Sequence, residues 1–555
     1  QSGNGCHAWF FFDQKVSAVS ARKFGTSLLT HSMDKRYEIS FKSYDRLFPN
    51  QDTMPKGGFG NLIALPLQKV ARDNDNSVFI DENFKPYSDQ WQFLSSIPKL
   101  NEKNMMSLIT ELTRGNDLGT LKNEVSETKP WVKQSIVLKK HDFPETVKIV
   151  TSDMLYVEKK GLSQKALNTL KRFAAFKNPE FYKAQAMRRS TYGKDRVISC
   201  SDNYENYLAL PRGCEDDIKS LLKRKNVTLI HEDESNPGKM INIEFRGVLR
   251  DEQQSALDAL SAHDNGVLSA ATAFGKTVIG AKLISIKKVN TLVLVHRQQL
   301  LSQWRESLEQ FLIINESLPE LPQKRGRKKE QNLIGHMAAG KDKLSSIVDV
   351  AIMQSMNVKG VVREAVKNYG MIIIDECHHV PAVTFEQILK NAPAKYIYGL
   401  TATPARPDGH HPIIFFYCGP VRFSVDPKEQ AEKRPFDHYL VPRFTSFKTM
   451  PDDDEKELSL QEIKANLITD EIRNQLILDD ALECYEKGRK ILILTGRVAH
   501  VEELGKKLKK KVPNVICLTG GMGVKKTAQV MEKIDVIADA EPFVLVATGS
   551  YIGEG

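Results

Sequence analysis

Hydrophobic positions change their spacing along this chain of 555 residues, and the changes divide it into regions. Residues 1–100 hold short apolar runs, which predict strands, and one amphipathic stretch over 17–34, which predicts a helix. The apolar runs are "AWFFF", "GNLIALPL" and "NSVFI". Sequence rich in Pro and Gly, such as "FPNQDTMPKGGFG", separates them. Residues 101–130 are polar and weakly periodic, which is typical of a linker.

Residues 131–240 predict a smaller α/β region with two charged helices. We expect "LSQKALNTLKRFAAFKNPEFYKAQAMRRS" to form one basic helix and "CEDDIKSLLKRK" to form another helix. Basic helices suit contact with DNA, whereas a solvated helix face is the more ordinary interpretation of charges at this density. Both interpretations stay open.

From residue 241 onward, continuous apolar runs alternate with helical patterns. The runs "TLVLVH", "VDVAIMQ", "MIIID" and "YIYGLTAT" predict buried strands of a parallel sheet. After an acidic stretch, "PDDDEKE", a second series follows with "KILILTG", "NVICLTG" and "FVLVATG". The predicted fold class is therefore α/β, with two similar parallel-sheet regions over 241–440 and 441–555.

Composition narrows the class of protein. The net charge of +10 and pI near 9.0 favour a polyanionic partner. The seven cysteines lack paired spacings and indicate reduced thiols. No apolar run approaches the length of a membrane span, and the first residues do not form a signal peptide. The chain ends in a glycine turn, "VLVATGSYIGEG", so we expect a fragment at both ends.

The strongest chemical signal is "SAATAFGKTVIGAKL", residues 269–283. A glycine-containing turn that opens a helix directs backbone N–H groups at phosphates. Lys276 would reach the β- and γ-phosphates, and the Thr277 hydroxyl would bind Mg²⁺. Ala273 and Gly275 would line the loop. Ala270 stands where the P-loop pattern has its first glycine.

A second signal, "MIIIDECHH" at 371–379, supports the first. An apolar strand ends in Asp375, which would hold Mg²⁺ through water, and Glu376, which would orient or deprotonate the attacking water. His378 and His379 follow, and hydrogen-bonding histidines are a better interpretation here than zinc ligands.

Three further segments fall in order around these two. "LTATP" presents the hydroxyls of Thr401 and Thr403 after a buried strand. "FRGVLRDEQQSAL" precedes the P-loop, and we expect its Arg250 and Gln253 to read the adenine edge. "LVLVHRQQLLSQW" follows it, and Arg297 and Gln298 stand at a strand-to-helix turn suited to a nucleic-acid backbone.

Together these motifs resemble a superfamily 2 DExH helicase of the XPB-like and type III restriction-like branch. The resemblance implies two RecA-like lobes that bind ATP and Mg²⁺ between them, with nucleic acid crossing both. "ILILTGRVAHVEEL" resembles the motif that opens the second lobe, and Gly553 lies in a segment resembling a motif that couples nucleic acid to nucleotide. The motif that carries the arginine finger is expected beyond Gly555, so the second lobe is expected to be truncated.

The first hundred residues resemble the archaeo-eukaryotic primase superfamily in "SGNGCH", "SYDRLFPNQ" and "GGFGNLIALPL". The resemblance implies a primase-like α+β domain, with a nucleotide site at Ser2, Gly3, Asn4 and His7. It also implies a metal carboxylate at Asp45, and hence a second divalent metal site. A turn role for Asp45 and a packed role for His7 stay open, as does primer synthesis.

The domain order resembles helicase–primase fusions of TOTE conflict systems. That resemblance implies the bacterial cytosol, DNA, and effector nucleases as partners. A basic insert, "QKRGRKKE", is either a solvated loop or a DNA contact through Arg325 and Arg327. The predicted function is an ATP-dependent DNA helicase or translocase. The alternative is a nucleotide-switched DNA-binding protein without motor activity, against which the carboxylate pair argues.

Overall fold

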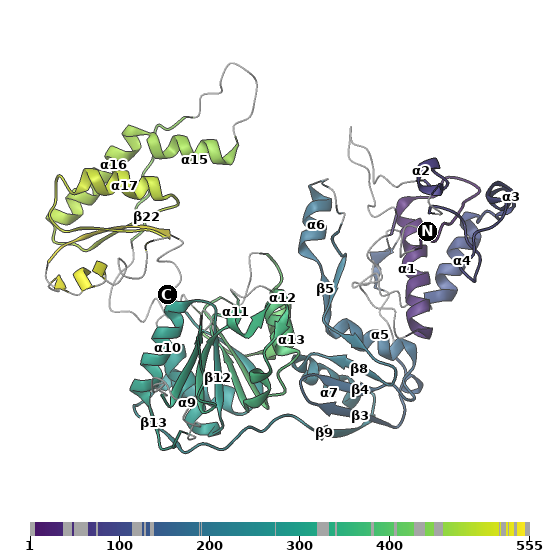
Figure 1. The fold of residues 1–555 in the computed structure, drawn as a ribbon, viewed down its shortest axis with the longest axis horizontal. Helices are drawn as coiled ribbons and strands as arrows, with labels where there is room; N and C mark the ends of the chain where they lie inside the picture. The colour runs from purple at the N-terminus through teal and green to yellow at the C-terminus, as the bar shows by residue number, and fades with distance from the viewer. Residues whose placement is uncertain are drawn as a thin grey trace. The chain divides into compact units, whose positions relative to one another are not determined.

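The computed structural model divides into two compact units, residues 1–433 and 434–555 (Figure 1). No helix among the described residues is long and apolar enough to cross a membrane. The structure describes residues 6–36, 47–48, 65–73, 76–113, 125–126, 129–133, 138–187, 189, 191, 193–271, 274–318, 332–338, 341–378, 382–403, 408–426, 439–448, 459–520, 522, 529–530, 532–534, 536–537 and 541–549.

The N-terminal part of the first unit is mainly helical where it is described. The expected amphipathic helix is present as α1 (Ala18–Lys35), which Ser17 caps by accepting from the Ser20 N–H. The strands expected at 8–12 and 76–80 are wrong, because those residues form only isolated bridges. The other elements here are α2 (Lys69–Arg72), α3 (Gln90–Ser96), α4 (Glu102–Thr113), β1 (Val125–Ser126) and β2 (Lys129–Lys133).

The expected linker over residues 101–130 is partly helical. Helix α4 packs against α1, and Met105 on α4 has no exposed surface. The polar composition of this stretch hides a short apolar stripe that includes Met105. The strand expected in "GNLIALPL" lies outside the described residues except for its last three.

Residues 138–240 form an intermediate domain around a five-stranded sheet with the order β7-β8-β4-β3-β9. Its strands β3 and β9 are parallel, and the other neighbours are antiparallel. The elements are β3 (Thr146–Thr151), β4 (Leu155–Glu158), α5 (Gln164–Phe173), β5 (Ala175–Lys177), α6 (Pro179–Ala186), β6 (Val197–Ser199), β7 (Asp202–Asn203), β8 (Tyr207–Leu210), α7 (Glu215–Arg224) and β9 (Thr228–Asp233).

The single basic helix expected over 162–190 is wrong, because the chain forms α5, β5 and α6 there. Pro179 disfavours helical backbone at the residue before it, so helix α5 cannot continue through Asn178. Asn178 instead caps the new helix by accepting from the Glu180 N–H at 3.0 Å. The charged helix expected at 214–225 is present as α7.

The rest of the first unit is built on an eight-stranded sheet with the order β15-β14-β16-β12-β19-β20-β11-β21. All neighbouring strands are parallel except β14 and β15. The strands are β11 (Asn265–Ser269), β12 (Thr291–Val295), β14 (Ile334–Ala338), β15 (Lys341–Lys343), β16 (Val348–Ile352), β19 (Met371–Ile374), β20 (Tyr396–Thr401) and β21 (Val421–Ser424).

Helices cover both faces of this sheet. Alternate side chains of β12 point to opposite faces, so Leu292 and Leu294 join one hydrophobic cluster while Val293 and Val295 join the other. One face is covered by α8 (Asp251–Ser261), α9 (Lys276–Lys287) and α10 (Gln298–Phe311), and the other by α11 (Met353–Met356), α12 (Ala382–Leu389) and α13 (Pro412–Cys418). Smaller pairs are β10 (Ile243–Phe245) with β13 (Leu312–Ile314), and β17 (Asn357–Val358) with β18 (Val361–Val362).

The intermediate domain shares its core with the eight-stranded sheet. Leu155 and Leu208 of the smaller sheet belong to the same buried cluster as Ile372 and Ile397 of the larger one. Gly213 lies directly on α13, where a Cβ atom would overlap the backbone oxygens of Phe415 and Phe416. The intermediate domain is therefore packed against the helix-covered face of the larger sheet.

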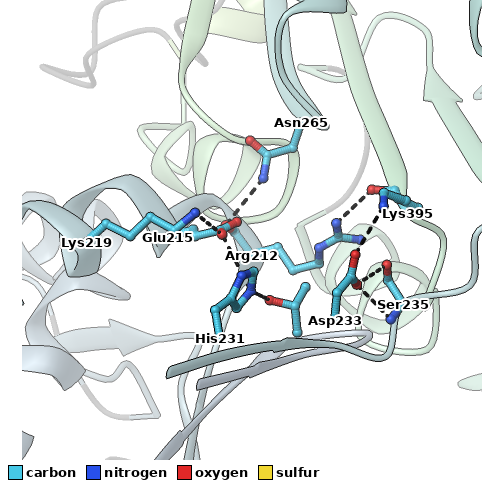
Figure 2. A network of polar contacts seen from close by, with 9 residues as sticks. Arg212, Glu215, Lys219, His231, Asp233, Ser235, Asn265 and Lys395 are labelled. Carbon is cyan, nitrogen blue, oxygen red and sulfur yellow. Dashed lines mark hydrogen bonds and ion pairs between the residues drawn. The ribbon is translucent and has the colours of Figure 1, made fainter. Parts of the chain in front are cut away.

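A polar network also stabilises the contact between the intermediate domain and the eight-stranded sheet (Figure 2). The buried Arg212 guanidinium donates to the backbone carbonyls of Ala394 and Lys395, just before β20. The Lys395 ammonium pairs with Asp233 at 3.2 Å, and the side-chain amide of Asn265 donates to the Arg212 carbonyl at 3.5 Å. No pattern in the sequence predicts the burial of Arg212.

The second unit holds a parallel sheet with the order β22-β24-β23. All three strands expected from the second apolar series are present. His500 joins the sheet to its helices, because it shares hydrogen bonds with Thr495 at 2.9 Å and Asn474 at 2.8 Å. The elements are α15 (Leu460–Thr469), α16 (Glu471–Glu486), β22 (Ile491–Thr495), α17 (Val498–Leu508), β23 (Val515–Leu518) and β24 (Val544–Thr548).

We predict that Gly213→Ala destabilises the first unit. The added methyl group meets backbone rather than a movable side chain, and overpacking of this kind costs about 1–3 kcal/mol. Calorimetry of the whole chain should show Tm falling by about 2 °C or more for the transition of this unit. Gly496→Ala is the control, because nothing lies within 4 Å of a Cβ atom there. Equal Tm values for the two variants would contradict the close contact.

Candidate functional site: a P-loop facing paired carboxylates

The P-loop joins the buried strand β11 to helix α9. Gly275 ends the loop with φ at 92°, a left-handed conformation that favours glycine. A Cβ atom there would also collide with the side-chain amide of Gln253. Lys276 and Thr277 then begin the helix, with the Lys276 side chain 9% exposed. Thr272 and Ala273 lie outside the described residues.

Arg250 and Gln253 hold this loop from the start of helix α8. The Gln253 amide nitrogen donates to the Phe274 carbonyl at 2.8 Å, and its oxygen accepts from the Arg250 N–H at 3.0 Å. The Arg250 guanidinium donates to the same Phe274 carbonyl. Both residues lie beside the loop, and these bonds go to the backbone of the chain, while the contact with an adenine edge stays a prediction. The bonds fix the shape of the P-loop.

Asp375 follows strand β19 and is almost fully buried. Its Oδ2 accepts from the indole N–H of Trp304 at 2.7 Å. Burial raises the pKa of Asp375 to about 6, against the opposing effect of the Trp304 hydrogen bond. Trp304 lies on α10 and has 1% of its surface exposed. We did not predict this partner, because an indole within an apolar helix pattern is indistinguishable from a core residue.

Glu376 forms the centre of the site. Its Oε1 lies 2.9 Å from the Lys276 ammonium, and its Oε2 lies 3.2 Å from His378 Nδ1. Burial alone would raise the pKa of Glu376, but His378 and Lys276 outweigh burial and lower the pKa to about 2. The backbone φ of Glu376 is 44°, a strained value that costs a non-glycine residue about 1–3 kcal/mol.

The "LTATP" segment contacts the same carboxylate. The Ala402 N–H donates to Glu376 Oε2 at 3.4 Å. Thr401 shares a hydrogen bond of 2.7 Å with His378 Nδ1, and its hydroxyl donates to the Thr403 carbonyl at 3.0 Å. A continuous polar chain therefore runs from Lys276 through Glu376 and His378 to Thr401.

Parallel pairing explains why these segments meet. Strand β20 is hydrogen-bonded to β11 on one side and to β19 on the other. The carboxyl ends of all three strands therefore lie along one edge of the sheet, where ligands bind in open α/β folds. Residues that are about a hundred positions apart in the sequence are therefore neighbours at this edge.

Other expected site residues lie elsewhere or outside the description. Arg297 is the N-cap of α10 after β12, and Gln298 is the exposed first residue of that helix. His7 is exposed in the N-terminal part. Among the described residues, no group of three or more His, Cys, Asp or Glu side chains gathers to hold a metal. The expected site residues that lie outside the described part of the chain are Ser2, Gly3, Asn4, Asp45, Arg325, Arg327 and Gly553.

The donor set at this edge fits a nucleotide with Mg²⁺. Thr277, Asp375 and Glu376 offer hard oxygen atoms, which Mg²⁺ prefers. Lys276 supplies a positive charge at the start of a helix, directly after the left-handed turn at Gly275. These features are those of the class of P-loop nucleotide-binding proteins.

Comparison with known proteins agrees with this class. Residues 246–406 match the family described as type III restriction enzyme, res subunit. Residues 1–108 match the family described as TOTE conflict system, archaeo-eukaryotic primase domain. The chain therefore contains one region similar to each of these two families, and the similarity to the helicase family implies use of ATP and Mg²⁺.

Individual relatives match parts of the chain. Putative helicase 109L of Invertebrate iridescent virus 3 is 29% identical over 208 residues, covering 34% of this chain and 56% of the relative. The DNA 3'-5' translocase XPB2 of Sulfurisphaera tokodaii is 28% identical over 236 residues, covering 42% and 48%. The chain thus spans about half the length of these relatives. The structure of T4 UvsW matches with a TM-score of 0.37 at 16% identity, covering 74% of this chain and 81% of that one.

We predict that Trp304→Phe lowers Mg²⁺-dependent ATP turnover by about 10-fold. Phenylalanine keeps most of the packing but removes the only N–H that the indole offers Asp375, and loss of such a supporting bond typically costs 10-fold or more. The measurement is turnover against Mg²⁺ concentration. Leu308→Met, one turn further along α10, is the control for packing. Unchanged turnover in Trp304→Phe would show that the bond does not position Asp375.

Proposed function

We propose that the chain is an ATP-dependent DNA helicase or translocase fused to a primase-polymerase-like domain. The observation that carries the proposal is the 2.9 Å contact between the P-loop lysine and the carboxylate of Glu376. A phosphate-binding lysine and a carboxylate that can act on water are thereby held at one site. The family matches and the helicase names of the relatives support the DNA-dependent activity.

Each residue of the site has a role in this proposal. Lys276 leaves Glu376 to bind the β- and γ-phosphates, and Glu376 then becomes available to orient the attacking water and accept its proton. Thr277 and Asp375 would hold Mg²⁺, which neutralises phosphate charge when bound. The Glu376–His378–Thr401 contacts place the carboxylate and the coupling segment in one hydrogen-bonded chain.

The remaining site residues keep their expected roles as part of the proposal. Thr401, Thr403 and Gly553 couple the nucleotide to nucleic acid. Arg250, Gln253, Ala273 and Gly275 line the ATP site. Arg250 and Gln253 contribute mainly by holding the shape of the P-loop. Nucleic acid is contacted by Arg297, Gln298, Arg325 and Arg327.

We also propose the domain division expected from the sequence. It consists of a primase-like domain over 1–100, a linker over 101–130, an intermediate domain over 131–240, and two helicase lobes over 241–440 and 441–555. The primase-like nucleotide site comprises Ser2, Gly3, Asn4 and His7, with Asp45 at a second divalent metal. The family match over residues 1–108 supports a conflict-system setting, with effector nucleases as partners in a bacterial cytosol.

The alternative is a DNA-binding protein that ATP switches without turnover. The carboxylate beside the P-loop lysine favours hydrolysis, because a pure switch does not need a base at that position. ATP turnover with and without DNA separates the two functions.

We predict that two substitutions at the ion pair both reduce ATP turnover but differ in their effect on ATP binding. Lys276→Ala should abolish ATP binding and turnover, because it removes the charge that meets the phosphates. Glu376→Gln should retain ATP binding but lose turnover by about 100-fold or more, since general-base contributions are about 10²–10⁴-fold. Nucleotide binding by fluorescence titration and phosphate release measure the two effects.

Lys282→Ala, on the same helix but with its ammonium over the Phe245 ring, is the control for these variants. It should turn over ATP like the unaltered protein. DNA-stimulated turnover that persists in Lys276→Ala would refute the assignment of the site.

A further inference from the structure

A basic arm extends from the intermediate domain. We define the arm as residues 175–199, in which β5 pairs antiparallel with β6 and helix α6 lies at the end of this pair (Figure 1). Its sequence carries six Lys or Arg residues and two Asp or Glu residues, a net charge of +4. The whole chain has a net charge of +10, so 25 residues hold a large share of it.

Aromatic rings support the cations of the arm. The Lys177 ammonium lies 5.0 Å from the centroid of the Tyr182 ring. The Arg196 guanidinium lies 4.8 Å from the Phe181 ring and 5.7 Å from the Tyr182 ring. Phe181 is fully buried, so α6 has a packed anchor. A cation above an aromatic ring is attracted by the negative face of the ring.

Several positive charges of the arm face solvent. Lys177, Lys183 and Arg189 are exposed. Lys194 pairs with Glu180 at 3.4 Å. An exposed, positively charged and ordered surface is suited to the phosphate backbone of a nucleic acid.

The arm is seated on the helicase module. The Phe176 ring at its base lies 6.1 Å from the rings of Phe416 and His410. Gly409 approaches so closely that a Cβ atom there would lie 2.6 Å from Pro179. Gly409 and His410 come shortly after Thr403 in the sequence. Together with the Arg212 network, this contact ties the arm to the same body as the P-loop (Figure 2).

We propose that this arm is a contact site for the phosphate backbone of duplex DNA. In the described part of the arm, the rings of Phe181 and Tyr182 are buried or lie beneath cations. Single-strand binding surfaces instead expose aromatic rings on which bases stack. The proposal takes DNA as the nucleic acid from the proposed function, but its test needs no ATP turnover.

The test is the salt dependence of binding by the full chain. Labelled duplex DNA, single-stranded DNA and duplex RNA of equal length are titrated over a range of salt concentrations. The arm variant carries Lys177→Gln, Lys183→Gln and Arg189→Gln. We expect its duplex-DNA affinity to fall by about 10-fold or more, and the slope of log K against log salt to become shallower by about 2–3.

The matched control removes three exposed charges elsewhere in the same domain, through Lys160→Gln, Lys223→Gln and Arg224→Gln. It should leave the duplex-DNA slope within about one of the unaltered value. Equal losses in both variants would assign the effect to net charge and overturn the proposal. A loss confined to single-stranded DNA, a loss confined to RNA, or an unchanged slope in the arm variant would overturn it as well.

Basal ATP turnover without DNA separates this proposal from the proposed function. The arm variant should keep basal turnover, since none of its substitutions touches the P-loop. If the unaltered chain shows no turnover, the proposed function fails while the salt slopes still decide the role of the arm.

Discussion

Parallel pairing of β11, β19 and β20 is the constraint on which the candidate site depends. Parallel strands end along one edge, so three segments far apart in the sequence deliver their polar residues to one place. The strands are buried on both faces and cannot shift register without exposing apolar side chains. The sheet thereby fixes the positions of Lys276, Asp375 and Thr401 before any ligand binds.

The ion pair between Lys276 and Glu376 gives the site a self-contained resting state. Each charge satisfies the other, so neither is left buried without a partner. In the proposed function, a triphosphate would compete for the lysine and release the carboxylate. The lysine proposed to bind phosphate would thus also restrain the carboxylate proposed to act on water. The strained backbone at Glu376 is held in place by the Ala402 N–H and His378 contacts.

Motifs whose residue types and spacing follow from phosphate or metal binding were predictable from the sequence. Hydrogen-bond partners that meet only through tertiary packing were not. The apolar runs of both parallel sheets, the Gly275–Lys276–Thr277 turn and the Asp375–Glu376 pair follow from local pattern. The bond from Trp304 to Asp375 joins elements 71 residues apart, and no local pattern encodes it. Pro179 signals a helix boundary in the sequence, but the basic residues on both sides of it favour the incorrect prediction of one continuous helix. Short apolar runs near the N-terminus proved too weak to define strands.

Burial of Arg212 against the chain before β20 has a practical consequence for dissecting the protein. The change in sequence texture near residue 241 invites a cut there to isolate the ATPase region. Such a cut would strip the carbonyls of Ala394 and Lys395 of their donor and leave α13 without the surface that covers it. A shortened protein prepared in this way would present freshly uncovered apolar surface to solvent. Its poor solubility would then be a property of the cut and not of the P-loop region itself.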